Sequence, residues 1–190
     1  LNPDKLKEMY SKLFDDDKVF IHAHFGTNDI EDIFAKLRYL IVGCDCKWVV
    51  VDHLHMLVSA SNEGDERRTI DMIMTRLRSL VEETGAGIIL VSHLRRVEGN
   101  KGHENGISVS LSHLRGSNSI AQLSDCVIAL ERDQQSTDDV ESRTTRLRIL
   151  KSRYTGDVGL ASSLLYDTET GRLSEHFDSE LEILKEESPL

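Results

Sequence analysis

Two apolar runs in this sequence each end in a residue that can do chemistry. The run 48–51 (WVVV) is followed directly by Asp52, and the run 87–92 (GIILVS) is followed by His93. Short, strongly apolar runs are typical of buried strands in a parallel sheet. Because ligands of such sheets gather at the carboxyl ends of the strands, we expect Asp52 and His93 to lie at one edge. A carboxylate in that position is suited to holding Mg²⁺ in a nucleotide hydrolase.

Basic side chains gather in two stretches, although the chain as a whole is acidic. The net charge is −10, but the segment 174–190 holds six acidic residues against Lys185 alone and so supplies −5 of it. The first basic stretch holds Arg95, Arg96 and Lys101, and the second holds Arg143, Arg146, Arg148, Lys151 and Arg153. The first lies in a long loop, 94–112, and loops of that length are usually functional. Since local clusters decide where a phosphate backbone can lie, the sequence admits a nucleic-acid partner.

The periodicity of apolar residues predicts the elements that position these groups. Strands alternate with helices in the first half, and strands are separated by turns in the second half. Helices are expected from Asn28 or Asp29 to Ile41, over 65–83 and over 117–123. Strands are expected at 19–23, 48–51, 87–92, 126–130, 145–150 and 163–166, with a hairpin-type turn at 167–171. We therefore predict an α/β fold with a mixed sheet, parallel at its centre and antiparallel at its edge, flanked by helices.

Size and composition limit the class of protein. One hundred and ninety residues, 39% of them hydrophobic and 29% charged, suit a single globular domain. No apolar stretch approaches the ~20 residues that a membrane span needs, and no charged and then apolar leader opens the chain. Three cysteines are too few for a disulfide framework, which favours a reducing, cytoplasmic compartment. The first residue is Leu1, so we expect the chain to be a piece of a longer polypeptide.

Several segments, in order along the chain, carry a resemblance to a known family. They are VVVDHLHMLVSASNEGDERRTIDMIMTRLRSL from Val49, GIILVSHLRR from Gly87, LSHLRGSNSIAQLSDCVIALERDQQ from Leu111 and LRILKSRYTGDVG from Leu147. The chain resembles the helicase domain of the T-odd phage primase-helicases. It is similar, more distantly, to the mitochondrial replicative helicase and the DnaB-like hexameric helicases. The likeness spans residues 16–173, nearly the whole body of the chain.

The resemblance implies a RecA-like ATPase that forms a ring around single-stranded DNA and hydrolyses nucleoside triphosphate at subunit interfaces. Asp52 resembles the acid that holds Mg²⁺, and His93 resembles the residue that senses the terminal phosphate. Arg153 resembles the arginine finger that reaches into the neighbouring subunit's site. Its guanidinium is always charged and can stabilise charge that develops on the transferred phosphoryl group.

Other residues match the family's nucleotide-binding and DNA-binding positions. Arg132 and Tyr166 match the pair that sandwiches the base, a task suited to a planar cation and an aromatic ring. Lys151, two residues before the finger, is expected to assist on the nucleotide side. The residues that match DNA-contacting motifs are Arg95, Arg96 and Lys101 in the channel loop, and Arg115, Gly116 and Ser117 in the next motif.

One departure from the family pattern limits what this chain can do alone. No GxxxxGKS occurs in the sequence, so the phosphate-cradling loop is missing. The chain therefore resembles the C-terminal part of a RecA-like helicase domain over 1–173, followed by an acidic tail over 174–190. We expect the parent to be an NTP-dependent DNA helicase that uses Mg²⁺ with ATP or dTTP, and this part alone to be inactive.

The same resemblance implies partners and a location. We expect single-stranded DNA as the substrate strand and further copies of the chain as partners in a homo-oligomer, a hexameric ring. The acidic tail is expected to dock replication proteins, and no membrane is involved. The closer likeness to phage sequences favours a phage protein that acts in the bacterial cytoplasm.

Two other classes of function are compatible with parts of the sequence. His22 with His24, and His53 with His55, form HxH pairs at predicted strand ends, where alternate residues face one way and could hold a metal. A metal-dependent hydrolase on a barrel would use such pairs, but a barrel needs roughly 250 residues. The other alternative is a non-catalytic DNA-binding or partner-docking module. An upstream GxxxxGKS in the parent gene would favour the helicase over both.

Overall fold

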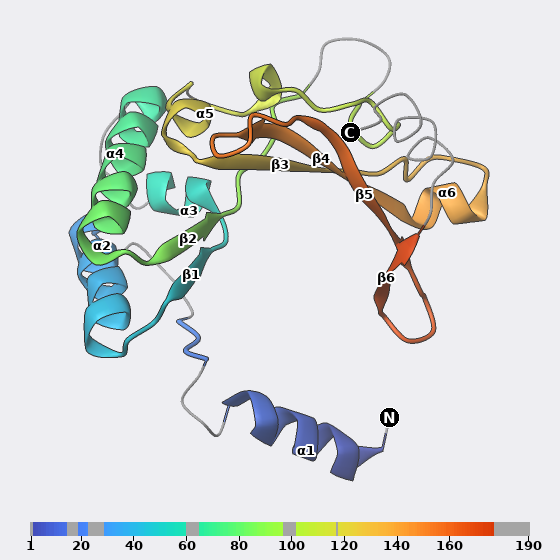
Figure 1. The fold of residues 1–190 in the computed structure, drawn as a ribbon, viewed down its shortest axis with the longest axis horizontal. Coiled ribbons are helices and arrows are strands. Elements are labelled where there is room, and N and C mark those ends of the chain that lie inside the picture. Colours follow the sequence, from blue (N-terminus) through green and yellow to red (C-terminus); the bar gives the residue numbers. More distant parts are fainter. Residues whose placement is uncertain are drawn as a thin grey trace. The chain divides into compact units, whose positions relative to one another are not determined.

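The chain folds into two compact units, Leu1–Ser92 and His93–Leu190. The computed structural model describes residues 2–14, 19–22, 29–59, 65–96, 102–116 and 118–176. Helices dominate the first unit, and an antiparallel sheet dominates the second (Figure 1).

The first unit combines helices with a small parallel sheet. Its elements are α1 (Pro3–Phe14), α2 (Ile30–Arg38), a π-helical turn (Tyr39–Gly43), β1 (Trp48–Val51), α3 (Leu54–Ser59), α4 (Glu66–Thr84) and β2 (Gly87–Leu90). Strands β1 and β2 pair in parallel, with Trp48 opposite Gly87 and Val51 opposite Leu90. The β-branched side chains that make up three of the four residues of β1 and two of the four of β2 favour this extended state. Because parallel strands cannot be joined by a tight turn, α3 and α4 form the crossover between them.

Helix α4 is fixed at both ends by residues that the sequence shows directly. The Asp65 carboxylate accepts hydrogen bonds from the backbone N–H groups of Arg67 and Arg68, and this caps the N-terminus. At the other end Gly85 has φ 71°, a left-handed conformation that glycine adopts without strain. Between the caps lies the buried apolar stripe of the helix, formed by Ile70, Ile73, Met74, Leu77 and Leu80. This stripe forms part of the core of the first unit, together with buried apolar residues of α2, β1 and α3.

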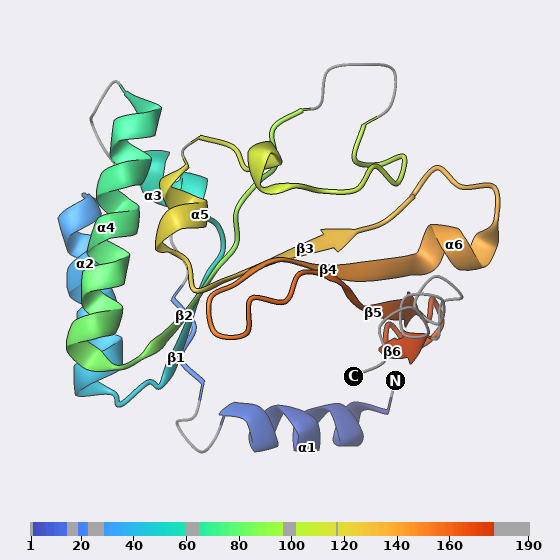
Figure 2. The same cartoon turned by 45° about the horizontal axis from the view of Figure 1, so that its top comes forward.

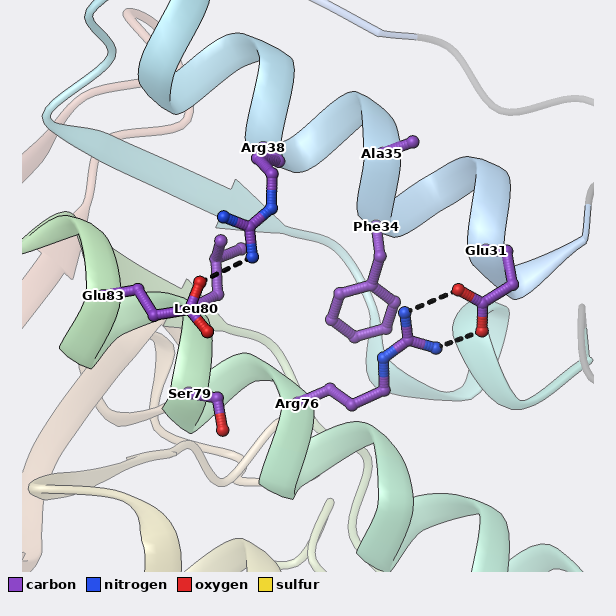
Figure 3. A pocket seen from close by; sticks show the side chains of 8 residues that line it. All are labelled: Glu31, Phe34, Ala35, Arg38, Arg76, Ser79, Leu80 and Glu83. Carbon is purple, nitrogen blue, oxygen red and sulfur yellow. Dashed lines mark hydrogen bonds and ion pairs between the residues drawn. The ribbon is translucent and has the colours of Figure 1, made fainter.

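Helices α2 and α4 are joined by aromatic and ionic contacts. The Arg76 guanidinium lies 4.0 Å from the centroid of the Phe34 ring. It also donates two hydrogen bonds to the Glu31 carboxylate, at 2.5 and 2.8 Å. These hydrogen bonds, and the positive charge behind them, lower the pKa of Glu31. A second ion pair, Arg38 with Glu83 at 2.6 Å, lies beside the first, and both line a pocket of about 430 Å³ (Figure 3).

The second unit is built around a four-stranded antiparallel sheet. Its strands are β3 (Cys126–Glu131), β4 (Thr144–Ser152), β5 (Gly159–Tyr166) and β6 (Leu173–His176), in the spatial order β3-β4-β5-β6. Each strand therefore pairs with the next one along the chain, and Figure 2 shows β3 running along β4. The short helices of this unit are a 3₁₀ turn (Leu111–His113), α5 (Ser119–Leu123) and α6 (Asp139–Arg143).

The turn between β5 and β6 follows from its sequence, DTETG. The Asp167 carboxylate accepts hydrogen bonds from the backbone N–H groups of Glu169, at 2.8 Å, and Thr170, at 3.2 Å. Hydrogen bonds from Thr170 and Glu169 lower the pKa of Asp167. Gly171, with φ 70°, closes the turn, because its N–H donates to the Asp167 carbonyl at 2.8 Å. The predicted turn at 167–171 is confirmed.

Most of the predicted elements are confirmed, with shifted ends. The parallel strands lie in the first unit and the antiparallel strands in the second, as two sheets among the described residues. The strand predicted at 19–23 is wrong, because Val19–His22 pairs with no strand in the described part of the chain, and a strand requires a neighbouring ladder. Periodicity also does not predict α1, α3 or α6. None of the described helices is long and apolar enough to cross a bilayer.

Candidate functional site

Asp52 follows β1 directly, and its side chain is exposed. The parallel pairing continues past the strand ends, because the Val91 N–H donates to the Val51 carbonyl at 3.0 Å and the Leu54 N–H donates to the Val91 carbonyl at 2.9 Å. Asp52 is one of the residues that line a groove of about 640 Å³, whose other lining residues include Trp48. An exposed carboxylate at this point fits a magnesium site of the nucleotide type, in which one or two carboxylates act together with water and phosphate oxygens.

The histidine pair next to Asp52 does not lie on a strand. His53 precedes α3 and His55 lies within it, so the alternation that would place both side chains on one strand face is wrong here. Their ring centroids are 6.0 Å apart, and the His55 Nε2 atom lies 3.6 Å from a Glu66 carboxylate oxygen. His24 lies outside the described residues. Among the residues that the structure describes, no three His, Cys, Asp or Glu side chains are grouped to hold a metal.

The segment that begins at His93 pairs with the segment around Arg115. An antiparallel bridge joins the two. The Arg95 N–H donates to the His113 carbonyl at 2.8 Å, and the Arg115 N–H donates to the His93 carbonyl at 3.1 Å. Three predicted site residues from distant parts of the sequence are thus brought together by backbone hydrogen bonds. Asp52 belongs to the first unit and His93 to the second, so the common edge expected for them stays a prediction.

Alternation places the side chains of this paired segment on two sides. Leu94 and Leu114 lie opposite each other and are half-buried. The residues next to them, His93, Arg95 and Arg115, are exposed, and alternation about the bridge predicts that their side chains lie on the other side. Two guanidinium groups and an imidazole therefore share one solvent-facing side. Such a surface can bind phosphate oxygens through charge-assisted hydrogen bonds.

The remaining predicted DNA-side residues are placed less completely. Gly116 has φ 108°, in the region that favours glycine, so a side chain at this position would strain the backbone. Arg96 is exposed. Lys101 and Ser117 lie outside the described residues.

Arg153 and Lys151 are both held against the end of α5. The Arg153 N–H donates to the Asp125 carbonyl at 2.8 Å, and its guanidinium donates to the Asp125 carboxylate at 3.2 Å. The Arg153 side chain remains 58% exposed, so a neighbouring molecule can reach it. The Lys151 ammonium donates to the carbonyls of Ala121, Gln122 and Ser124, at 2.7, 3.2 and 2.7 Å. An ammonium has three N–H donors, so Lys151 reaches a nucleotide only by releasing one of these carbonyls.

Arg132 and Tyr166, the predicted base-binding pair, contact neighbouring residues of α6. The Arg132 Nε–H donates to the Ser142 carbonyl at 2.6 Å. The Tyr166 carbonyl accepts a hydrogen bond from the Arg143 guanidinium at 3.3 Å. Both residues are half-buried. The structure therefore brings them to the same end of the sheet, where β4 begins: Arg132 directly follows β3, Tyr166 ends β5, and both strands flank β4.

One residue that the sequence analysis does not single out is Glu131, at the end of β3. Ala129 and Glu131 are buried, whereas Ile128 and Leu130 are 56% and 68% exposed. The strand thus alternates, and Glu131 occupies an inward position. The sequence signal for this position is its spacing: Glu131 lies two residues after Ala129, and in a strand such residues face the same side. A carboxylate at such a position requires partners, because burial without them is costly.

Comparisons with known proteins identify the family and the fold. Residues 2–175 match the family model described as the DnaB-like helicase C terminal domain. The chain is 41% identical over 169 residues to a DNA helicase/primase of Enterobacteria phage T3, covering 89% of this chain and 29% of that protein. The chain thus spans less than a third of the length of this curated relative.

Two solved structures share the fold. A DnaB-like replicative helicase, described together with its interactions with primase, matches with a TM-score of 0.67 and 21% identity, over 91% of this chain and 41% of that one. A KaiC-like protein from Pyrococcus horikoshii matches with a TM-score of 0.58 and 14% identity, over 93% of this chain and 71% of that one. At these identities the likeness shows the fold alone.

Proposed function

Because this chain belongs to the DnaB-like helicase C-terminal domain family, we propose that it is part of a replicative helicase that couples NTP hydrolysis to movement along single-stranded DNA. The expected resemblance to the phage primase-helicases and the RecA-like fold are confirmed. The observation that best supports the proposal is the paired segment in which His93, Arg95 and Arg115 share one exposed side. A phosphate-sensing residue and two DNA-side residues are thereby linked through their backbones.

The proposed chemistry assigns one task to each residue. Asp52 is the residue that would hold Mg²⁺, which when bound neutralises charge on the terminal phosphates of ATP or dTTP. His93 donates a hydrogen bond to the terminal phosphate. Since its carbonyl is bonded to the Arg115 N–H, a shift of His93 moves the DNA-side segment with it. Arg153 acts in the neighbouring subunit, where its planar guanidinium stabilises charge on the transferred phosphoryl group.

The nucleotide-side residues complete the site in this proposal. Arg132 and Tyr166 stack on the base from its two faces. Lys151 supports the finger, because it holds the end of α5 that carries Asp125, the ion-pair partner of Arg153. Arg153 leaves Asp125 when a phosphate of the neighbouring subunit takes the place of the carboxylate.

The proposed partners follow from the same family. We propose that the protein assembles into a hexameric ring with single-stranded DNA in its channel, contacted by Arg95, Arg96 and Lys101 and by the motif 115–117. We propose that the acidic segment 174–190 docks basic surfaces of other replication proteins. A phage protein acting in the bacterial cytoplasm is the proposed source and location.

The finger is tested by mixing two variants of the full-length protein. Arg153→Ala should abolish steady-state hydrolysis, because the transition state loses a charge partner. Asp52→Asn should abolish it for a different reason, the loss of the metal ligand. Mixed rings should recover part of the activity, since some interfaces then combine an intact site with an intact finger. If every mixture stays inactive while both variants assemble, Arg153 does not act across the interface.

The DNA-side residues are tested by salt dependence. Arg95→Ala should weaken binding of single-stranded DNA, and each lost phosphate contact should lower the slope of log K against log salt by roughly 0.7. A double variant with Lys101→Ala should lower it about twice as much. An unchanged affinity and slope would remove this segment from the DNA-binding surface.

A further inference from the structure

The buried carboxylate of Glu131 joins three segments of the second unit. Its side chain is only 6% exposed. One oxygen accepts the backbone N–H of Val109 at 2.6 Å. The Arg148 Nε–H lies 2.9 and 3.1 Å from the two carboxylate oxygens. Glu131 is therefore the common partner of the 102–116 segment, through Val109, and of β4, through Arg148.

The 102–116 segment is attached at both of its ends. At one end the residues near Arg115 pair with His93 and Arg95. At the other end the segment lies along the residues that follow β3, because the Gln134 N–H donates to the Glu104 carbonyl at 3.0 Å. Val109, 5% exposed, lies between these two attachments. The segment thus links the phosphate-sensing and DNA-side residues to the end of β3.

Strand β4 connects Arg148, the ion-pair partner of Glu131, with Arg153, the proposed arginine finger. Arg148 lies diagonally across from Glu131, on the same face of the antiparallel pair. Lys151 follows in the same strand, and Arg153 comes directly after the strand ends. Arg132 is the residue next to Glu131. The hydrogen bonds of the Glu131 carboxylate therefore connect the 102–116 segment, on the DNA side, with β4. The adjacent residue, Arg132, belongs to the nucleotide side.

A neighbouring ion pair offers a comparison with Glu131. Glu141 binds Arg146, the residue directly across from Glu131, and its side chain is 32% exposed. That pair joins residues only five positions apart, through two hydrogen bonds between α6 and β4. Glu141 lies in α6 and, like Glu131, has an arginine partner on β4, but this partner is only five positions away in the sequence. It is a matched control.

We propose that Glu131 is a positioning residue that couples DNA binding at the 102–116 segment to NTP hydrolysis at the finger strand, and this rests on the proposed function. When DNA binding displaces the 102–116 segment, Val109 moves with it. The Glu131 carboxylate, which is bonded to both Val109 and Arg148, transmits this movement to Arg148 and so to β4. Burial matters because a hydrogen bond to a charged group is stronger and more directional when water is excluded. Glutamine at this position keeps an oxygen that accepts the Val109 N–H, but it loses the charge that attracts Arg148.

The test compares Glu131→Gln with Glu141→Gln in the full-length protein. The quantity measured is the ratio of the hydrolysis rate with single-stranded DNA to the rate without it. Coupling of this kind typically amounts to a factor of about 5 or more, so we expect Glu131→Gln to lower the ratio by about that factor and Glu141→Gln to leave it unchanged. Arg148→Gln, which breaks the link from the other side, should lower the ratio as Glu131→Gln does.

A second measurement needs no nucleotide. Hydrogen exchange over 144–153 should change when single-stranded DNA is added to the unmodified protein, and this change should be lost in Glu131→Gln. An equal fall of both hydrolysis rates, with the ratio preserved, would mean a merely structural role and would overturn the proposal. So would an unchanged ratio in both Glu131→Gln and Arg148→Gln. An unmodified protein whose hydrolysis does not respond to DNA would instead overturn the proposed function itself, and the coupling with it.

Discussion

The two units of this chain are stabilised in different ways. In the first unit the buried side chains are almost all apolar, with Leu54, Ile70 and Ile73 completely inaccessible. In the second unit the buried residues that the structure describes include Glu131, Thr144 and Ser163, and the buried apolar ones are few: Val109, Ile120 of the short helix α5, and the small Ala129. The first unit is thus held by a packed core, and the second by hydrogen bonds, ion pairs and strand pairing.

The difference matches the tasks proposed for the units. The first offers a single carboxylate, Asp52, at the end of a short parallel sheet. The second carries the residues that we propose sense the phosphate, contact DNA and act as the finger, and in this proposal their positions respond to ligands. The hydrophobic effect that stabilises an apolar core does not depend on the relative orientation of the groups. Hydrogen bonds do depend on it, so they can transmit the displacement of one segment to another. The following predictions test this difference between the two units.

The largest effect is expected in the apolar core. Ile73→Ala removes a completely buried side chain of α4 and should lower the free energy of unfolding by about 2–5 kcal/mol. Ile128→Ala, the same change at a 56% exposed position of β3, should stay within about 0.5 kcal/mol. Urea unfolding followed by circular dichroism measures both. Similar losses for the two variants would contradict the contrast between the units.

A smaller loss is expected from the buried carboxylate. Glu131→Ala leaves the Val109 N–H without its acceptor and should lower the free energy of unfolding by about 1–3 kcal/mol. Glu141→Ala breaks a more exposed pair and should cost at most about 1 kcal/mol. Hydrogen exchange should show the loss of protection in β3 and β4 and not in α4. Equal costs for the two variants would mean that the second unit does not depend on this carboxylate.

A gain is expected at Ser163. This residue of β5 is completely buried, and its hydroxyl has no hydrogen-bond partner within the described parts of the chain. Ser163→Ala removes the unsatisfied group with little change in volume, so it should raise the free energy of unfolding by about 1 kcal/mol. The adjacent Ser162→Ala, at a half-buried position, provides the control. A loss of stability in Ser163→Ala would reveal a partner for the hydroxyl.

The smallest effect concerns pH and the contact between α2 and α4. The pKa of Glu31 is lowered from its ordinary value of 4.5 by Arg76, so the stabilisation is present above that value and is lost as the pH falls through the lower folded pKa. Glu31→Gln should therefore differ from the unmodified protein at pH 7 and converge with it in acid. Thermal melts at several pH values, repeated in high salt to screen the pair, test this. A difference that stays constant into acid would contradict the assignment.

Local sequence signals predict the helices and strands whose caps and apolar runs are strong. Asp65 and Gly85 mark the ends of α4, because capping depends on adjacent backbone groups. The apolar runs before Asp52 and His93 predicted β1 and β2, and the order of the motifs identified the family. A strand at 19–23 was expected on equally apolar residues, but strand formation depends on a distant partner that composition does not specify.

Which charged residues contact each other depends on the tertiary structure. Long-range pairing placed Arg115 beside His93, Asp125 beside Arg153 and Arg148 beside Glu131. It also placed the Lys151 ammonium on the carbonyls at the C-terminal end of α5, while the nucleotide-side role that the family resemblance implies for Lys151 stays a prediction. The physical reason is that the spacing of residues along the chain determines local geometry, whereas the partner of a charged side chain depends on which strands are adjacent.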